Sequence, residues 1–374
     1  MNVKEQLKRL LRLKRLWLLA ALPLAGLLYL LAHKVGGFAE FWARYIYPLL
    51  AHLLHGISRL VPVSLGELLV LALPVLLLAG LVLGVVHIVK SRGARFFAAV
   101  KAFVVNPVAI ASVLLLVFMT NCGVNYGRVS FSQISGLPVQ ATSPRELQQL
   151  CKELVAAANT LRSDLPEDEN GVYALSSSVN ETGEAARAAF AKLGKTYPTL
   201  QSGYGAPKAV LCSRGMSYLD ITGIFFPFTM EANVNVDVVD YNIPFTMCHE
   251  LTHLRGYMRE DEANFVAYLA CHGSESDDLR YSGTMLAFVY CINALHSADS
   301  SLVADVYAGM DDAVRRDLNA NNAYWKQFET PVAEISNNVN SAYIQANGDP
   351  DGVRSYGRMV DLLLAWVRAG NSVA

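Results

Sequence analysis

Residues 247 to 265 read MCHELTHLRGYMREDEANF and contain a five-residue metal-binding signature. The signature is His249-Glu250-Leu251-Thr252-His253, an HExxH sequence in which the two histidines are four positions apart. Positions four apart project from one face of a helix, so both imidazoles can reach a single Zn²⁺ ion. Glu250 lies beside them and can take a proton from water and later deliver it to a leaving amine. The stretch therefore predicts a helix that carries two metal ligands and a general base.

The residues around the signature favour a short helix. Asn242 can cap its N-terminus, Pro244 fits its first turn, and Gly256 provides a C-terminal stop shortly after His253. A helix of this length suits the signature, so we predict a bound metal ion rather than a merely charged helical face.

The signature supplies two protein ligands, whereas catalytic zinc sites have three. The metzincin pattern HExxHxxGxxH would place a third histidine at position 259, but Arg259 stands there, and arginine cannot ligate a cation. The nearby carboxylates are Glu260, Asp261 and Glu262. We therefore expect a carboxylate from the next helix to complete the site, as in His₂Glu sites.

Two of these carboxylates stay open as the third ligand. Glu260 is preferred, because Asn264 follows it by one helical turn and could hydrogen-bond the imidazole of a ligand histidine. Glu262 would allow a longer turn after Gly256 before the chain faces the metal. Asp261 is expected to point away.

The sequence does not single out the residue that would stabilise a developing oxyanion. Zinc peptidases use a tyrosine, histidine or arginine for this purpose. Six residues of these types are candidates: Tyr257, Tyr281, Tyr290, His272, His296 and Arg255. The segment 206–240, which precedes the signature, predicts short strands that could border a cleft and pair with an extended peptide.

The first third of the chain is strongly apolar. Of the 374 residues, 53% are hydrophobic and only 17% are charged, which is typical of a membrane protein. Three segments are long enough to cross a bilayer, at about 16–32, 65–89 and 102–122. Residues 1–122 are therefore predicted to form a membrane domain with three transmembrane helices.

Basic residues predict the orientation of these spans. They occur before the first span and between the second and third, at Lys4, Lys8, Arg9, Arg12, Lys14, Arg15, Lys90, Arg92, Arg95 and Lys101. The positive-inside rule then places the N-terminus in the cytoplasm and everything after Cys122 outside. Residues 38–60 predict an interfacial amphipathic helix, with His52 and His55 on its solvated polar face.

After residue 122 the long apolar runs stop, and residues 123–374 read as one extracytoplasmic α+β domain that is mostly helical. The formal net charge of −1 provides no basic field that would recruit nucleic acid. The six cysteines form no CxxC pair, and most are expected to be small buried apolar residues.

Two segments, FPFTMEANVN (226–235) and PFTMCHELTHLRGYMREDEANFVAYLAC (244–271), resemble the bacterial membrane-protein family of unknown function numbered 3810. Members of that family combine N-terminal spans with an HExxH domain. The ExxAN sequence from Glu260 to Asn264 is also similar to the ExxAD and ExxAN helices of gluzincin zinc peptidases. In those peptidases the first glutamate binds zinc and the residue four later supports a histidine. The resemblance implies a zincin-like domain but no particular substrate.

These observations together predict a zinc-dependent metallopeptidase anchored in the bacterial cell membrane, with the lipid bilayer and a peptide or protein substrate as partners. One Zn²⁺ ion would be held by His249, His253 and either Glu260 or Glu262, with Glu250 as general base. The alternative is a noncatalytic metal-binding membrane sensor or scaffold. The adjacent acids at positions 260–262 are also compatible with that function. A transporter is disfavoured, because no span carries a central charged residue.

Overall fold

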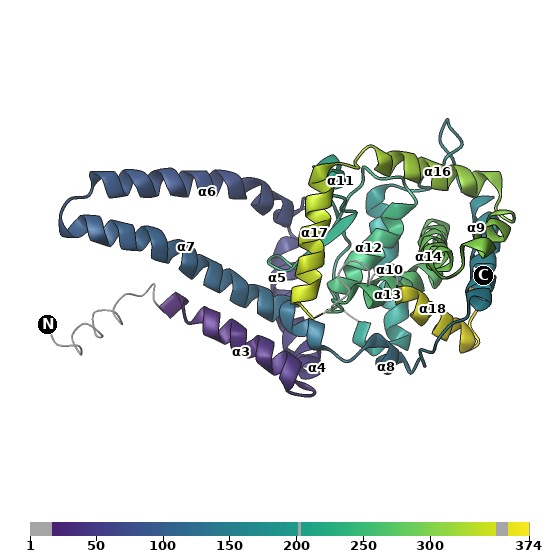
Figure 1. Ribbon diagram of the computed structural model, residues 1–374, viewed down its shortest axis with the longest axis horizontal. Helices are drawn as coiled ribbons and strands as arrows, with labels where there is room; N and C mark the ends of the chain where they lie inside the picture. Colours follow the sequence, from purple (N-terminus) through teal and green to yellow (C-terminus); the bar gives the residue numbers. More distant parts are fainter. Residues whose placement is uncertain (1–16, 201–202, 349–357, 374) are drawn as a thin grey trace.

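The computed structural model describes residues 17–200, 203–348 and 358–373. The chain is mostly helical and has two visible parts, namely long helices that project to one side and a rounded body (Figure 1). Leu16 and the basic residues before it, which entered the predictions of the first span and of the orientation, lie outside the described residues.

The projecting part consists of α3 (Ala21–Lys34), α6 (Leu65–Lys90) and α7 (Ala94–Asn121). Within the described residues, α6 and the segment Arg95–Asn121 are long and apolar enough to cross a membrane. A third candidate exists only if α3 and the helical segment Phe38–Ser58, which are bent by 111° to each other, count as one unit. The prediction of helices long and apolar enough to span a membrane is thus confirmed for two segments, or up to three.

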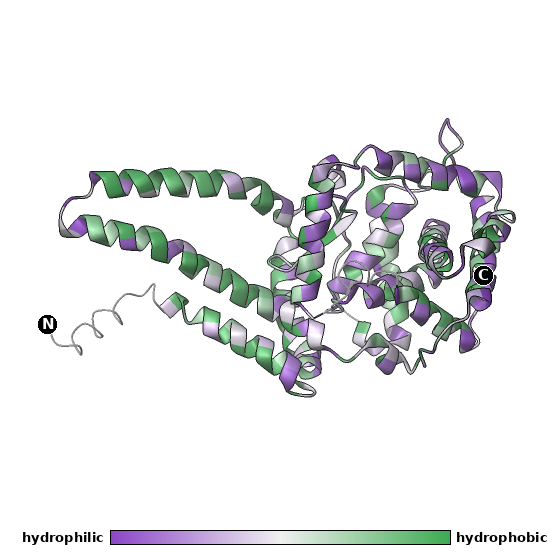
Figure 2. Ribbon diagram, in the orientation of Figure 1, coloured by the Kyte–Doolittle hydropathy of each residue, from purple (hydrophilic) through white to green (hydrophobic). Residues whose placement is uncertain are grey.

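The α6–α7 hairpin exposes an almost continuous apolar surface (Figure 2). Among its exposed side chains are Leu76, Leu77, Leu78, Leu83 and Val89 of α6 and Val104 and Ile110 of α7. Soluble proteins rarely expose contiguous apolar patches of more than a few hundred Å². In lipid these apolar side chains would not be exposed to water. The backbone polar groups of each helix would be satisfied within the helix.

Between α3 and α6 the chain forms α4 (Phe38–Phe41), a π-helical turn (Trp42–Ile46) and α5 (Tyr47–Ser58). The segment is amphipathic as predicted, but it turns its polar side toward the body of the protein. The prediction that His55 is solvated is therefore wrong. His55 is buried, with Nδ1 2.8 Å from the carbonyl oxygen of Met230 and with Nε2 accepting a hydrogen bond from the Gly205 amide.

The body is built from helices of very different length. The longer ones are α9 (Pro144–Arg162), α10 (Val179–Thr196), α12 (Asn242–His253), α13 (Glu260–His272), α14 (Asp277–Ala298), α16 (Asp312–Lys326), α17 (Pro331–Ala346) and α18 (Met359–Arg368). The short ones are η2 (Gly123–Gly127), α8 (Phe131–Ser135), η3 (Pro198–Leu200), α11 (Ser213–Ser217), η4 (Ser300–Leu302) and α15 (Val303–Tyr307). Helices α12 and α13 lie at the centre and are buried along most of their length, which is why the signature region is so apolar.

A small sheet covers one side of α12. Its strands are β1 (Lys208–Ala209), β2 (Gly223–Phe226) and β3 (Glu231–Val234), in the order β1-β3-β2. Strand β2 is antiparallel to β3 and forms an edge of this sheet. The predicted strand alternation extends to Val238, but β3 ends earlier because the Asn235 side chain accepts a hydrogen bond from the Asp237 amide and so forms a local turn.

The sheet is joined to α6 by one buried carboxylate, that of Glu231 on β3. It accepts hydrogen bonds from the Leu65 and Gly66 amides at the N-terminus of α6, from Lys208 Nζ at 2.6 Å and from Thr229 Oγ1 at 2.6 Å. Burial opposes ionisation, but Lys208 and the other donors outweigh it and lower the pKa of Glu231. The charge therefore stabilises the start of α6 and its attachment to the body.

Replacing Glu231 by glutamine should destabilise the protein by about 3 kcal/mol at neutral pH, because Lys208 loses its buried partner. The folded-state pKa of Glu231 is lowered, so its contribution is present above the unfolded value of about 4.3 and is lost as the pH falls. Thermal unfolding in detergent should show a Glu231→Gln deficit that is largest near pH 7 and shrinks in acid. Glu169→Gln, at an exposed acid, is the control, and an equal shift for both variants would contradict the assignment.

Candidate metal centre

Helix α12 presents the two signature histidines toward the start of α13. His249, Glu250 and His253 all lie in the second half of α12. The chain then reverses through Gly256, whose φ of 80° is a left-handed conformation that favours glycine, and α13 begins at Glu260. The prediction of Gly256 as the helix stop is confirmed, whereas Asn242 is the first helical residue and its side chain does not cap the helix.

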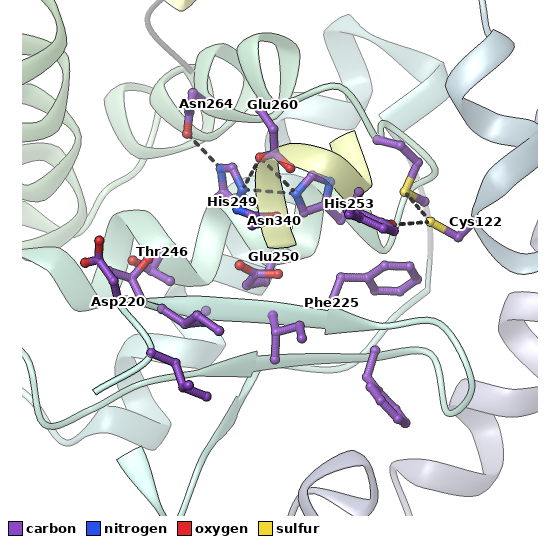
Figure 3. Close-up of a pocket in the computed structure, with 18 of the residues that line it drawn as sticks. Cys122, Asp220, Phe225, Thr246, His249, Glu250, His253, Glu260, Asn264 and Asn340 are labelled. Carbon is purple, nitrogen blue, oxygen red and sulfur yellow. Dashed lines mark hydrogen bonds and ion pairs between the residues drawn. The ribbon is translucent and has the colours of Figure 1, made fainter. Parts of the chain in front are cut away.

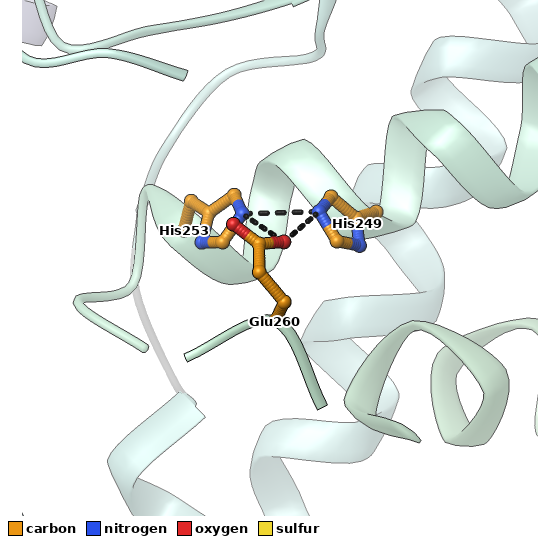
Figure 4. A group of neighbouring side chains, drawn as sticks. All are labelled: His249, His253 and Glu260. Carbon is orange, nitrogen blue, oxygen red and sulfur yellow. Dashed lines mark hydrogen bonds and ion pairs between the residues drawn. The ribbon is translucent and has the colours of Figure 1, made fainter. Parts of the chain in front are cut away.

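The reversal places one carboxylate oxygen against both imidazoles (Figures 3 and 4). Glu260 Oε2 lies 3.2 Å from His249 Nε2 and 3.6 Å from His253 Nε2. The two Nε2 atoms are 3.0 Å apart. These three side chains could hold a metal ion.

Hydrogen bonds on the far side of each ring orient the histidines. His249 Nδ1 lies 2.8 Å from Asn264 Oδ1, and His253 Nδ1 lies 2.8 Å from the carbonyl oxygen of Tyr257. Both partners are acceptors, so each Nδ1 carries the proton and each Nε2 lone pair points into the centre. The predicted contact between Asn264 and a signature histidine is confirmed.

The centre is buried and strongly coupled. Burial would lower the pKa of His253, but the carboxylates of Glu260 and Glu250 outweigh it and raise that pKa to about 9. Burial likewise opposes ionisation of Glu260, yet the two histidines hold its pKa well below the usual range. Glu260 Oε2 makes no hydrogen bond of ordinary geometry within the described residues. The arrangement favours positive charge between the three side chains, supplied either by a proton or by a cation.

Glu262, the other carboxylate left open by the sequence, does not join this cluster. Its Oε1 accepts a 2.6 Å hydrogen bond from the Phe131 amide and pairs with Arg259. Asp261 lies 3.6 Å from the guanidinium of Arg358, also away from the histidines. The register of α13 thus directs Glu260 inward and its two neighbours elsewhere.

Glu250 lies between the histidines and strand β2 (Figure 3). Burial raises the pKa of its carboxyl, although the nearby His249 and His253 oppose that shift. The Phe225 amide of β2 donates a hydrogen bond to the carboxylate, while Oε2 is buried without a partner in the described residues. A buried carboxyl with one free oxygen and a raised pKa suits a group that accepts and returns a proton near neutral pH.

A cavity of about 780 Å³ adjoins the centre. Helices α12, α13 and α14 contribute to one wall, β2 and the loop before it to another, and the end of α7 and α17 also line the cavity. The lining is mainly apolar, with Phe118, Phe225 and Tyr343 among its larger side chains. Such a space, with a few polar groups converging on it, is typical of a binding site.

The turn between α12 and α13 is held by residues from much earlier in the chain. Tyr47 of α5 donates a hydrogen bond to the Leu254 carbonyl at 3.0 Å. Arg128 donates from Nη1 to the carbonyl oxygens of Arg255 at 3.2 Å and Gly256 at 3.1 Å. The position of Glu260 therefore depends on contacts far away in sequence.

Of the six candidates for oxyanion stabilisation, Tyr290 lines the cavity, and its hydroxyl hydrogen-bonds the Asn264 side chain. The others face different partners: Tyr257 contacts Thr199, Tyr281 contacts Asp317, Arg255 binds the Leu200 carbonyl, His272 stacks on Tyr268, and His296 is exposed at the end of α14.

Sequence reasoning missed three contributors to the site. They are the Tyr257 carbonyl, the Phe225 amide and Gly223, on which a Cβ would lie 2.5 Å from Glu250 Oε1. The two backbone groups have no side-chain signal. For Gly223 the sequence signal is weak: a glycine at the start of the Gly-Ile-Phe-Phe strand suggests a close approach by another group.

The two glutamates can be separated by metal content. We expect Glu260→Gln to lose metal bound to the purified protein and Glu262→Gln to retain it, because only Glu260 faces both histidines. Elemental analysis of folded, monodisperse protein measures this, with circular dichroism as the check on folding. Metal retained by Glu260→Gln and lost by Glu262→Gln would reverse the assignment.

Comparison with known proteins places this geometry in a family context. No match is found among curated proteins or among solved structures. Residues 42–364 match the family model described as "Protein of unknown function (DUF3810)", and the match includes α6, α7 and the candidate metal centre but not α3. The chain therefore belongs to this family, whose function is not known.

Proposed function

We propose that the chain is a membrane-anchored, zinc-dependent metallopeptidase with a zincin-like catalytic domain. The observation that carries this proposal is the convergence of Glu260 Oε2 with the Nε2 atoms of His249 and His253. Two imidazoles from an HExxH helix and a glutamate from the next helix match the His₂Glu donor set of catalytic zinc sites, and the ExxAN sequence that begins at Glu260 is similar to that of gluzincin peptidases.

The spacing of the donor atoms supports zinc as the ion. Ligands about 2.0–2.1 Å from a tetrahedral zinc ion are separated from one another by about 3.3 Å. The three separations here are 3.0, 3.2 and 3.6 Å. Since both Nδ1 atoms are occupied by hydrogen-bond acceptors, His249 and His253 can present Nε2 without changing tautomer.

When bound, a zinc ion would supply Lewis-acid chemistry that makes hydroxide available near neutral pH. Glu250 would take the proton that the attacking water releases and return it to the leaving amine. Burial raises the pKa of the Glu250 carboxyl and so makes the carboxylate a stronger base. The Phe225 amide binds one carboxylate oxygen, and the other oxygen can exchange the proton. Tyr290 is the side chain best placed to donate a hydrogen bond to the developing oxyanion, because it alone of the six candidates lines the cavity.

Strand β2 suits a peptide as the substrate. It is an edge strand of the described sheet and it lines the cavity next to Glu250. An extended peptide can add to such an edge through main-chain hydrogen bonds, while its side chains enter apolar pockets. Phe225, Phe226 and Phe228 would contact those side chains.

The hairpin supports an orientation for the enzyme. The turn between α6 and α7 lies at the end farthest from the body and carries Lys90, Arg92 and Arg95 (Figure 1). Basic residues beside membrane spans remain on the cytoplasmic side. The body would accordingly lie outside the cytoplasmic membrane of a bacterium, with the N-terminus inside.

Substituting Glu250 by glutamine tests the mechanism. We expect Glu250→Gln to keep its metal and to lower the rate of peptide hydrolysis by about 10²–10⁴-fold, the range attributed to general acid–base catalysis. The measurement is cleavage of a denatured protein mixture by the purified protein in detergent, followed by mass spectrometry, with chelator-treated and zinc-restored wild type as controls. Unchanged hydrolysis by Glu250→Gln would exclude this mechanism, and a wild type that binds zinc but cleaves nothing would favour the sensor or scaffold.

Gly223 provides a second test of the same site. A Cβ at this position would lie 2.5 Å from Glu250 Oε1 and 2.6 Å from Thr246 Cγ2, so Glu250 must move. We expect Gly223→Ala to bind metal normally but to lose about 10²-fold in kcat, as small displacements of a catalytic group do. Gly215→Ala is the matched control, because its nearest contact would be Cys212 Cβ at 4.0 Å. Equal activity of the two variants would contradict the predicted role of Gly223.

A further inference from the structure

Helix α17 lies across the cavity and joins two of its walls. In the N-terminal half of α17, Asn337 Nδ2 donates a 2.8 Å hydrogen bond to Asp220 Oδ2. Near its C-terminal end, the Tyr343 hydroxyl lies 3.5 Å from Cys122 Sγ and 3.4 Å from the hydroxyl of Tyr126, just beyond α7. The inner face of α17 therefore covers the metal centre, as the position of Asn340 in Figure 3 shows.

A second side of α17, next to the face that covers the cavity, is apolar and largely exposed among the described residues. Val332, Ile335 and Val339 are exposed to 51%, 63% and 64%, respectively. They recur at helical spacing and lead to Tyr343, so these four residues form one stripe, called here the α17 stripe. The helix carries a single charged residue, Glu334.

A second apolar stripe runs along α4, the π-helical turn and α5. Its members share an i, i+4 spacing and are all exposed: Phe41, Tyr45, Leu49, Leu53 and Ile57. They are called here the α5 stripe. Its exposure is explained by the burial of the opposite side of α5 against the body, through Tyr47, Ala51 and His55.

Both stripes are continuous with the membrane-spanning candidates. Helix α5 ends at Ser58, and α6 begins at Leu65. The C-terminal end of α17 contacts the end of α7 through Tyr343 and Phe118, whose rings are 6.0 Å apart. In Figure 1, α5 and α17 lie crosswise to the hairpin, at the boundary between the hairpin and the body. A bilayer around the hairpin would meet both helices along their length.

We propose that the α5 and α17 stripes rest in the lipid surface, so that the metal centre opens at the membrane interface. Val339 and Tyr343 belong both to the α17 stripe and to the lining of the cavity, which places the cavity directly behind the lipid-facing helix. Insofar as the proposed peptidase function holds, the substrate is a polypeptide segment already held at the bilayer, such as the stretch just outside a membrane anchor. The single charge on α17 indicates contact through apolar side chains rather than through basic residues that bind anionic headgroups.

Lipid contact can be tested without any hydrolysis. Cys212 is the exposed cysteine among the described ones, so full-length Cys212→Ser protein can be labelled with a fluorophore at one introduced cysteine. The protein is placed in nanodiscs whose lipids carry a nitroxide high in the acyl chain. We expect the label on Val339→Cys to be quenched several-fold more strongly than that on Asn338→Cys, the adjacent position on the polar side of α17.

Two reference positions calibrate the quenching. Leu77→Cys on α6 marks the lipid interior, and Gln149→Cys on α9 marks the end of the body opposite the hairpin (Figure 1). Leu49→Cys on the α5 stripe should match Val339→Cys. Quenching of both stripes no greater than at Gln149→Cys overturns the proposal. Cross-linking of Val339→Cys between two copies, without lipid quenching, would assign the stripe to a dimer contact instead.

The consequence for substrates needs a second experiment. Val332 and Ile335 do not line the cavity, so their replacement by aspartate changes the stripe and not the site. We expect Val332→Asp/Ile335→Asp protein to cleave a soluble peptide as the wild type does and to cleave the same peptide fused to a membrane anchor several-fold more slowly. Asn338→Asp is the matched control. Equal cleavage of both substrates by the double variant and by the wild type would overturn the inference. A wild type that cleaves neither substrate would instead contradict the proposed function, and the quenching result would stand.

Discussion

The reversal between α12 and α13 is the constraint on which the candidate centre depends. The backbone of this turn leaves three carbonyl groups, those of Leu254, Arg255 and Gly256, that need hydrogen-bond donors from elsewhere in the protein. Tyr47 and Arg128 satisfy them. The Arg128 guanidinium also lies 4.1 Å from the centre of the Tyr257 ring, and the carbonyl of Tyr257 in turn holds His253. The same few contacts therefore set both the direction of α13 and the orientation of one imidazole.

These contacts make the N-terminal third of the chain part of the site. Gly256 is packed so closely that a Cβ would lie 3.2 Å from Tyr47 Cε1 and 3.1 Å from Asn125 Nδ2. His55 joins α5 to the Met230 and Gly205 backbone, and Glu231 joins the sheet to α6. The family match begins at residue 42, near the start of this packed region. These buried contacts make α5 and the start of α6 part of the packing around the candidate site.

The lengths and types of the main elements follow closely from the sequence. The apolar run from residue 65 is α6, and α9 begins where the Ser143 side chain accepts a hydrogen bond from the Glu146 amide, because caps and hydropathy act within one or two turns. The burial of five of the six cysteines also agrees with their apolar character. The burial of His55 could not be predicted in this way, since no local sequence feature distinguishes a solvated histidine from one that bridges two backbone groups. The side of an amphipathic helix that faces the body is a property of what packs on it, and here the body offers polar partners.

The sequence by itself determined that His249 and His253 share one helical face with Glu250 beside them, because a spacing of four residues is decided within about one helical turn. It also limited the candidates for the third ligand to Glu260 and Glu262. The sequence could not distinguish these two, since both lie in the first turn of α13. Only the tertiary structure decided between them as the neighbour of the histidines. Which residue of a helix start faces a partner depends on the direction in which that helix leaves the preceding turn, and this direction is set by Tyr47 and Arg128, more than a hundred residues earlier in the chain.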